Sequence, residues 1–280
     1  MQRIDAHQHF WRLDRGDYGW LTAELAPLYR DFAPGDLQPL LQRHGVAQTV
    51  LVQAADSTAE TDFMLELAAS HDWIGGVVGW VDISDRASIA TLERWAREHP
   101  KFKGVRPMLQ DLPEDDWIAT RPHADVMACI AALGLRLDAL VLPRQLEPLL
   151  HFVRRHPTLP VVIDHAAKPR LDEGWSAVWA HAWRRDMAAL AAHPNLMCKF
   201  SGLLTETRSS EPLPLIRPAW EDLLRWFGPQ RLVWGSDWPV LNLAADYGRW
   251  VALSDSLLGD LNAADQQRVL HDNAREFYTL

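Results

Sequence analysis

The chain has 280 residues, of which 48% are hydrophobic and 23% charged, and this balance excludes a disordered chain, a collagen-like fibre and a coiled coil. The net charge of −9 argues against a nucleic-acid partner, because phosphate binding requires a clustered basic surface. Two separated cysteines, no apolar leader and no apolar run of membrane length predict a soluble, cytoplasmic protein without a membrane partner.

Short apolar runs alternate with helix-period segments along the whole sequence. The runs at 50–52 and 161–163 are apolar at successive positions, which is typical of parallel strands covered on both faces. Helices with apolar stripes are expected near 89–96, 122–134, 146–153 and 269–278. The predicted strands are Ile4–His9, Thr49–Gln53, Gly76–Ile83, Lys103–Pro107, Leu135–Val141, Val161–His165, Leu196–Ser201 and Leu232–Asp237. Eight strands, each followed by a helix, predict an α/β fold: a single-domain, TIM-type (β/α)8 barrel over residues 1–280.

The connections that follow the predicted strands are often longer than those that precede them. The segments after His9, Pro107, Gly202 and Asp237 are long, whereas helix-to-strand links such as 156–160 are short. All strand-to-helix loops of such a barrel gather at its C-terminal mouth, where catalysis occurs in this architecture. The asymmetry therefore indicates an active site at that end.

Two histidines, His7 and His9, lie two residues apart at the end of the first predicted strand. Residues at this spacing project from the same face of a strand, so both imidazoles are expected to point into the barrel near its upper end. Neutral imidazole is a common ligand for zinc and related ions. The spacing therefore predicts metal ligation, with two hydrogen-bonded structural histidines as the alternative.

Two further polar residues end predicted strands, His165 on the sixth and Asp237 on the eighth. Either residue alone is more often structural, and an aspartate at such a position commonly caps a turn. Because strand ends meet at one mouth, three imidazoles and a carboxylate are expected to converge there. The set predicts a metal site with room for water.

Two cationic residues are further candidates: Arg106 closes the fourth predicted strand at the same rim, and Lys199 lies on the seventh, one residue from the buried-looking Cys198. The guanidinium of Arg106 can bind a substrate carbonyl or carboxylate through its planar fork. The alternative for Arg106 is a salt bridge with a loop carboxylate such as Asp111 or Asp116. Lys199 is interpreted as a residue that senses substrate or pairs with Asp237, and the alternative is a snorkelling surface lysine.

Three tryptophans, Trp11, Trp80 and Trp238, lie at or just beyond predicted strand ends. Aromatic faces pack on the C–H side of a sugar ring, while Gln53 or Asp82 can bond its hydroxyl groups. These residues are therefore candidate substrate contacts. Core packing is at least as good an interpretation for each aromatic.

Nine motifs follow one another along the chain and together carry a family resemblance. They are Ile4-Asp5-Ala6-His7-Gln8-His9-Phe10-Trp11, Val52-Gln53-Ala54, Val78-Gly79-Trp80-Val81-Asp82, Gly104-Val105-Arg106, Asp164-His165-x-x-Lys168-Pro169, Lys199-Phe200-Ser201-Gly202, Phe227-Gly228-Pro229-x-Arg231, Gly235-Ser236-Asp237-Trp238-Pro239 and Asn273-Ala274-x-x-Phe277. The ordered set resembles the lactonase branch of the amidohydrolase superfamily. The L-fuconolactonase and L-rhamnonolactonase types are nearest in pattern, and pyrone-dicarboxylate lactonase is more distant.

The resemblance implies a distorted barrel whose site consists of the first-strand histidine pair, the sixth-strand histidine and the eighth-strand aspartate. In this sequence these are His7, His9, His165 and Asp237. Binuclear members of the wider superfamily carry a bridging lysine or glutamate on strand four and a histidine on strand five. Arg106 and the histidine-free segment Leu135–Val141 occupy those places here, which argues against a second metal. The resemblance thus implies one divalent ion, zinc before others, and leaves a metal-free site open, since some relatives in this branch are thought to work without a metal.

The expected reaction is hydrolysis of a sugar lactone to its aldonic acid. Asp237 is assigned as the general base on water. A bound divalent ion would polarise the carbonyl or activate the water, and without one Arg106 and the histidines, His165 among them, would stabilise the oxyanion. One alternative keeps the site for metal-dependent decarboxylation of an unsaturated acid, with Arg106 holding the substrate carboxylate. Another is a noncatalytic sugar-acid binding protein, against which a positioned base argues. Neither the preferred lactone nor the oligomeric state follows from the sequence.

Overall fold

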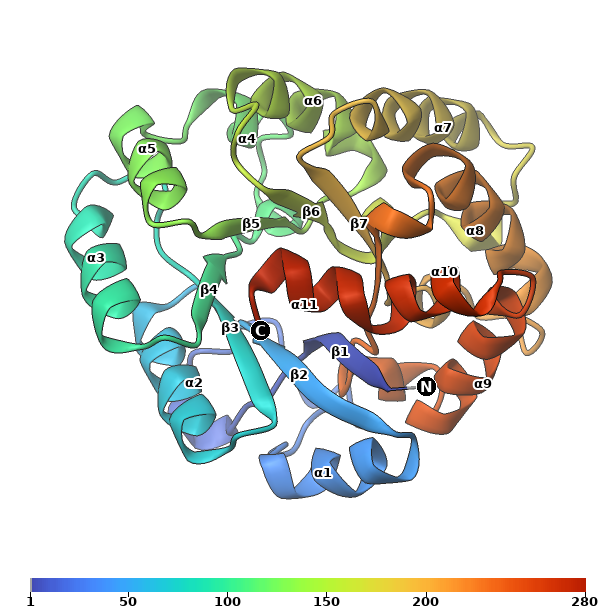
Figure 1. The fold of residues 1–280 in the computed structure, drawn as a ribbon, viewed down its shortest axis with the longest axis horizontal. Helices are drawn as coiled ribbons and strands as arrows, with labels where there is room; N and C mark the ends of the chain where they lie inside the picture. The colour runs from blue at the N-terminus through green and yellow to red at the C-terminus, as the bar shows by residue number, and fades with distance from the viewer. Residues whose placement is uncertain (1) are drawn as a thin grey trace.

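The computed structural model describes residues 2–280, whose eight parallel strands form one sheet in the order in which they occur along the chain (Figure 1). The strands are β1 (Arg3–Gln8), β2 (Val46–Val52), β3 (Ile74–Gly79), β4 (Phe102–Val105), β5 (Arg136–Ala139), β6 (Val161–Ile163), β7 (Leu196–Phe200) and β8 (Leu232–Trp234). Each strand pairs with its chain neighbour, and helices surround the ring. The predicted (β/α)8 barrel is confirmed.

The helices occupy the connections between strands and the segment that follows β8. They are α1 (Pro34–Arg43), α2 (Thr58–Ser70), α3 (Ser88–Glu98), α4 (Trp117–Thr120), α5 (Ala124–Ala132), α6 (Leu146–Arg155), α7 (Val178–Ala191), α8 (Leu213–Phe227), α9 (Tyr247–Leu258), α10 (Ala263–Gln267) and α11 (Asn273–Tyr278). Within the described residues, no helix combines the length and the apolar character needed to cross a bilayer.

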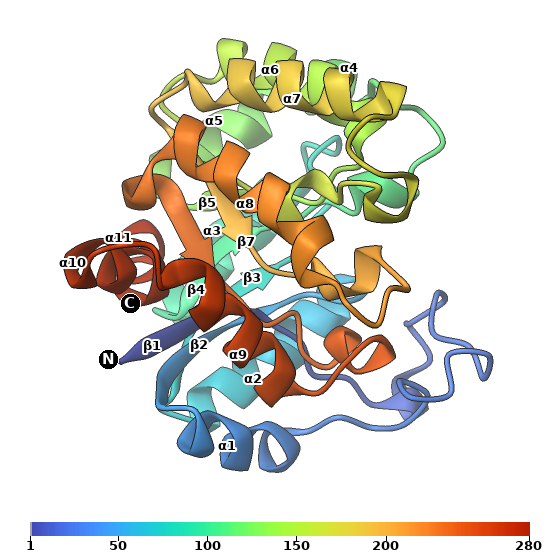
Figure 2. The ribbon, with the colours of Figure 1, turned by 90° about the vertical axis from the view of Figure 1, so that its right-hand side faces the viewer.

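The chain ends and the long loops lie at opposite ends of the barrel. Figure 1 shows α11 passing across the ring of strands, and Figure 2 shows both termini on one side and the long loop after β1 on the other. Tyr278 of α11 is fully buried against an apolar layer inside the barrel that includes Ile4, Val50 and Val162. This layer closes the N-terminal end, so polar side chains above it face the mouth.

Several strands end earlier than the sequence predicts. β3 ends at Gly79 rather than Ile83, and β5 ends at Ala139 rather than Val141. β6 stops before His165 and β8 before Asp237, because both residues have left-handed backbones, with φ of 52° and 60°. The predicted strand ends were therefore wrong where the chain turns to present polar side chains.

The strand pairing around the barrel is least extensive between β1 and β8. One isolated bridge, Gln8 to Trp238, connects them instead of a continuous ladder. Two backbone bonds accompany it: Asp237 N–H donates to the carbonyl of His7 at 2.8 Å, and His9 N–H donates to that of Trp238 at 2.7 Å. The first and last strands thus meet through the residues on which the site is built.

Candidate active site

Three imidazoles surround one carboxylate oxygen at the mouth of the barrel. Asp237 Oδ1 lies 3.3 Å from His9 Nε2 and 3.7 Å from both His7 Nε2 and His165 Nε2. All four side chains are buried. The convergence expected from the strand ends is therefore present: β1 supplies His7 and presents His9, and the turns after β6 and β8 supply the other two.

The outer ring nitrogen of each histidine has its own partner. His9 Nδ1 lies 2.8 Å from the carbonyl oxygen of Val52, and His165 Nδ1 lies 2.9 Å from Ser201 Oγ. His7 Nδ1 lies 3.0 Å from Lys199 Nζ and 3.4 Å from Asp164 Oδ1. Such contacts fix the orientation of an imidazole and leave its other nitrogen aimed into the site.

Burial lowers the pKa of all three imidazoles, and it lowers that of His165 to about 4. The ammonium of Lys199 lowers the pKa of His7 further. Burial by itself raises the pKa of Asp237, but the neighbouring His165 and the His9 hydrogen bond hold it below its usual range. Neutral imidazoles therefore face an ionised carboxylate.

This arrangement fits a bound cation. Because a carbonyl can only accept, His9 Nδ1 carries the proton and its Nε2 is bare, yet Nε2 lies 3.3 Å from the ionised Asp237 Oδ1. His7 Nε2 lies 3.7 Å from the same carboxylate oxygen and 3.3 Å from Arg106 Nη1. Two lone pairs at such a distance repel unless positive charge lies between them. Histidine nitrogens and a carboxylate are ligands that suit zinc, and His7, His9 and Asp237 lie close enough together to share one ion.

Behind the histidines lies a buried network of charges. Asp164 Oδ2 is 3.2 Å from Arg106 Nη1, and its Oδ1 is 3.0 Å from Lys199 Nζ. Lys199 Nζ also lies 2.5 Å from Asp138 Oδ2, which accepts a hydrogen bond from the hydroxyl of Tyr278 at 2.8 Å. Arg106 therefore pairs with Asp164 rather than with Asp111 or Asp116. Lys199 is fully buried and pairs with Asp138 and Asp164, so neither the expected pairing with Asp237 nor a surface position is found.

A cavity of about 220 Å³ opens above the histidines and Asp237. Of the predicted residues, His9, Arg106, His165 and Asp237 line it, and His7 lies directly behind them. The remaining lining residues are Trp20, Leu25, Ala54, Met108, Gln110, Asp111, Leu140, Lys168, Val240 and Leu243. A space of this size suits a molecule with a single ring.

The predicted substrate contacts Trp11, Gln53, Trp80, Lys199 and Trp238 do not line this cavity. Trp11 is fully buried, and its indole N–H donates to the carbonyl of Arg30 at 2.9 Å. Trp238 packs edge-on against Phe10 and Phe32. The amide of Gln53 bonds to Arg106. Gln53 and Lys199 contact site residues from behind, Trp11 and Trp238 pack among neighbouring aromatic side chains, and Trp80 is half-buried outside the cavity lining.

Trp20, Lys168 and Asp164 were not predicted as site residues. Trp20 reaches the cavity from the long loop after β1, where its indole N–H donates to the carbonyl of Ala54 at 2.7 Å. Lys168 comes from the turn after β6. Asp164 directly precedes the predicted ligand His165, and both Asp164 and Lys168 belong to the motif Asp164-His165-x-x-Lys168-Pro169, so the sequence held a signal for these two residues.

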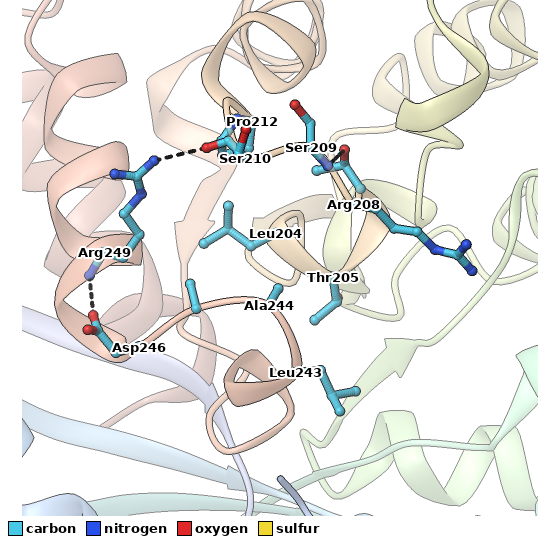
Figure 3. Close-up of a pocket in the computed structure, with 12 residues that line it drawn as sticks. Leu204, Thr205, Arg208, Ser209, Ser210, Pro212, Leu243, Ala244, Asp246 and Arg249 are labelled. Atoms are coloured by element: carbon cyan, nitrogen blue, oxygen red, sulfur yellow. Dashed lines mark hydrogen bonds between the residues drawn. The ribbon is translucent and has the colours of Figure 1, made fainter. Parts of the chain in front are cut away.

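A larger, more open cavity of about 690 Å³ lies beside the first, with Leu243 in both walls. Figure 3 shows it between the loop that includes Leu204 and Ser210 and the segment that includes Ala244, Asp246 and Arg249. None of the three histidines or Asp237 lines it. The smaller cavity is therefore the candidate active site.

Comparison with known proteins identifies relatives along the whole chain. The amidohydrolase family model matches residues 4–280. The chain is 45% identical over 282 residues to an L-fucono-1,5-lactonase of Burkholderia ambifaria, covering 99% of this chain and 96% of that protein. It is 38% identical over 289 residues to an L-fucono-1,5-lactonase of Burkholderia multivorans, with the same shares covered.

Solved structures agree with these relatives. A crystal structure of an amidohydrolase from Burkholderia multivorans with bound zinc superposes with a TM-score of 0.94, at 36% identity and with both chains fully covered. A 2-pyrone-4,6-dicarboxylic acid hydrolase from Pseudomonas putida, at 24% identity and a TM-score of 0.78, shares the fold. The matched family model and the relatives above 30% identity show that this chain belongs to the amidohydrolase family.

Proposed function

We propose that this chain is a lactonase that hydrolyses a sugar lactone of the L-fuconolactone type to its aldonic acid, with one divalent ion held by His7, His9, His165 and Asp237. The observation that carries the proposal is the Asp237 carboxylate, one oxygen of which lies 3.3 to 3.7 Å from three imidazoles, below a cavity of single-ring size. The 45% identity to an L-fucono-1,5-lactonase over 99% of the chain supports the substrate class.

Asp237 is the base of the proposed reaction. One oxygen of its carboxylate takes a proton from water as the water oxygen bonds to the lactone carbonyl carbon. The ring C–O bond then breaks, and the same proton passes to the departing ring oxygen. The released acid ionises, so each turnover yields one aldonate and one proton.

Arg106, which lines the cavity beside Asp237, is the proposed donor to the oxyanion formed on the carbonyl oxygen. Both its Nη atoms bond to Asp164 or Gln53, and the buried Nε has no partner among the described residues. A donor of this kind contributes about 3–4 kcal/mol when it is aimed at developing charge. A bound divalent ion supplies further polarisation of the carbonyl or lowers the pKa of the attacking water.

A screen of aldonolactones with a pH indicator tests the proposal. We expect proton release with L-fucono-1,5-lactone, and the same panel is assayed for carbon dioxide and, by calorimetry, for binding. Carbon dioxide release from unsaturated acids without proton release from lactones would establish the decarboxylase instead. Binding without turnover across the panel would establish a sugar-acid binding protein.

Removal of the divalent ion should lower both activity and stability. We expect purified protein to carry about one zinc per chain, and dialysis against dipicolinate to reduce turnover at least about 100-fold and to lower the melting temperature. Zinc added back should restore both. The measurements are metal analysis, lactone hydrolysis and thermal unfolding of the same samples. Full turnover by metal-depleted protein would favour the metal-free site, in which Arg106 and the histidines act alone.

Gly202 should be required for the position of His165. A Cβ on Gly202 would lie 2.5 Å from His165 Nδ1, and the φ of this residue is +65°. We expect Gly202→Ala to cost about 1–3 kcal/mol of stability and to lower kcat at least about tenfold, because the imidazole must move. Gly134→Ala is the matched control, since Gly134 has the same φ of +65° and nothing within 4 Å of an added Cβ. Equal kcat for the two variants would contradict this role.

A further inference from the structure

Four consecutive residues after β6 adopt the left-handed conformation. His165, Ala166, Ala167 and Lys168 have φ of 52°, 51°, 57° and 48°. A left-handed backbone costs a residue with a Cβ roughly 1–2 kcal/mol, and such residues normally occur singly. Strain of this kind persists only where the surroundings enforce it, and it clusters at functional sites.

The surrounding structure holds this turn firmly. Lys168 N–H donates to the carbonyl of His165 at 2.8 Å, and the indole N–H of Trp183 in α7 donates to that of Ala166 at 2.9 Å. The two alanine side chains are fully buried. Residues three apart on so tight a turn lie on the same side, so His165 and Lys168 both line the candidate cavity.

Lys168 differs from the other lysine of the region in its partners. Lys199 is fully buried between two carboxylates. The nearest anionic partner of Lys168 is Glu206, with Nζ and Oε1 3.9 Å apart, and both side chains are about one-fifth exposed. Among residues 2–280, no hydrogen bond to Lys168 Nζ is formed. The ammonium thus offers free donors to whatever fills the cavity.

We propose that Lys168 is a specificity-determining residue, whose ammonium donates to a hydroxyl oxygen of the sugar lactone. The inference rests on the proposed lactonase function. An ammonium has donors and no acceptor, so it distinguishes a lactone that carries ring hydroxyls from one that carries none. The strained turn places the Lys168 ammonium on the same wall of the cavity as His165, three residues earlier in the chain.

Lys168→Met tests this role, with Lys103→Met as the matched control. Lys103 lies on β4, where its ammonium bonds to the carbonyl of Thr279, away from the mouth. We expect Lys168→Met to raise KM for L-fucono-1,5-lactone about 10- to 100-fold with kcat within about threefold. KM for δ-valerolactone, which has no hydroxyl groups, should stay within about twofold. Lys103→Met should leave both substrates unaffected.

Two results would overturn the assignment. An unchanged KM for the hydroxylated lactone would show that Lys168 does not bind it, and an equal increase in KM for both lactones would show that Lys168 has no role in substrate selection.

If wild-type protein hydrolyses no aldonolactone, the proposed function fails first. Calorimetric binding of L-fuconate by the same variants then decides whether Lys168 binds a hydroxylated ligand. Lys168→Arg keeps the charge and should preserve the preference for the hydroxylated lactone. If a folded Lys168→Arg protein lost that preference, the result would also contradict the proposal.

Discussion

Asp237→Asn is expected to lower kcat/KM for the lactone by about 1,000-fold or more. The amide cannot accept the proton of the attacking water, and it is a poorer ligand for a divalent ion than the carboxylate. The backbone should tolerate the change, because asparagine is among the residues most often found at positive φ, and Asp237 has φ of 60°. Steady-state kinetics on L-fucono-1,5-lactone measures the effect.

Two controls separate chemistry from folding in this experiment. Asp260→Asn removes an exposed carboxylate that pairs with Arg217 and should keep wild-type kinetics. Thermal unfolding of Asp237→Asn should remain cooperative even where the loss of a bound ion lowers its midpoint. Lactone hydrolysis within tenfold of wild type by the folded variant would remove Asp237 from the base role.

Lys199→Met should be the most damaging single change to stability. The variant leaves Asp138 and Asp164 buried without the ammonium that lies 2.5 and 3.0 Å from their oxygens. Breaking a buried pair in this way costs about 3–5 kcal/mol. Urea unfolding measures the loss. The double variant Lys199→Met/Asp138→Asn should recover part of it, and simple additivity of the two changes would show that the pair is not coupled.

The loss of unfolding free energy caused by Lys199→Met should also depend on pH. Burial raises the pKa of Asp138, and the ammonium of Lys199 opposes this rise, so the pKa is raised further in the variant. A carboxyl whose folded pKa is raised contributes its stability at low pH and loses it as pH increases through that pKa. The difference in unfolding free energy between wild type and variant should therefore be smaller near pH 5 than near pH 8.

The convergence of four site residues could be predicted from the sequence because it depends only on periodicity and topology. Strand alternation places His7 and His9 on one face, and a parallel barrel brings the ends of β1, β6 and β8 together. Neither step requires knowledge of a loop. For the same reason the strand count was correct although individual ends were not.

The substrate-facing wall could not be predicted in the same way. Trp20 comes from a long loop with no repeating pattern, and Lys168 depends on a left-handed turn that periodicity does not reveal. Trp11 and Trp238 lie where a sugar contact was expected, but adjacent loops bury them. The burial of Lys199 could not be predicted either, because a lysine is seldom fully buried without ionic partners, and its two carboxylate partners come from distant parts of the chain.

The limited pairing between β1 and β8 has a consequence for how the barrel closes. Two of the proposed ligands, His7 and His9, lie at the end of β1, and a third, Asp237, follows β8. An ion shared by them would therefore link the first strand to the last at the point where the barrel closes. A growing polypeptide on the ribosome cannot form this link until β8 and Asp237 have emerged. Catalytic competence and completion of the ring would then be a single event.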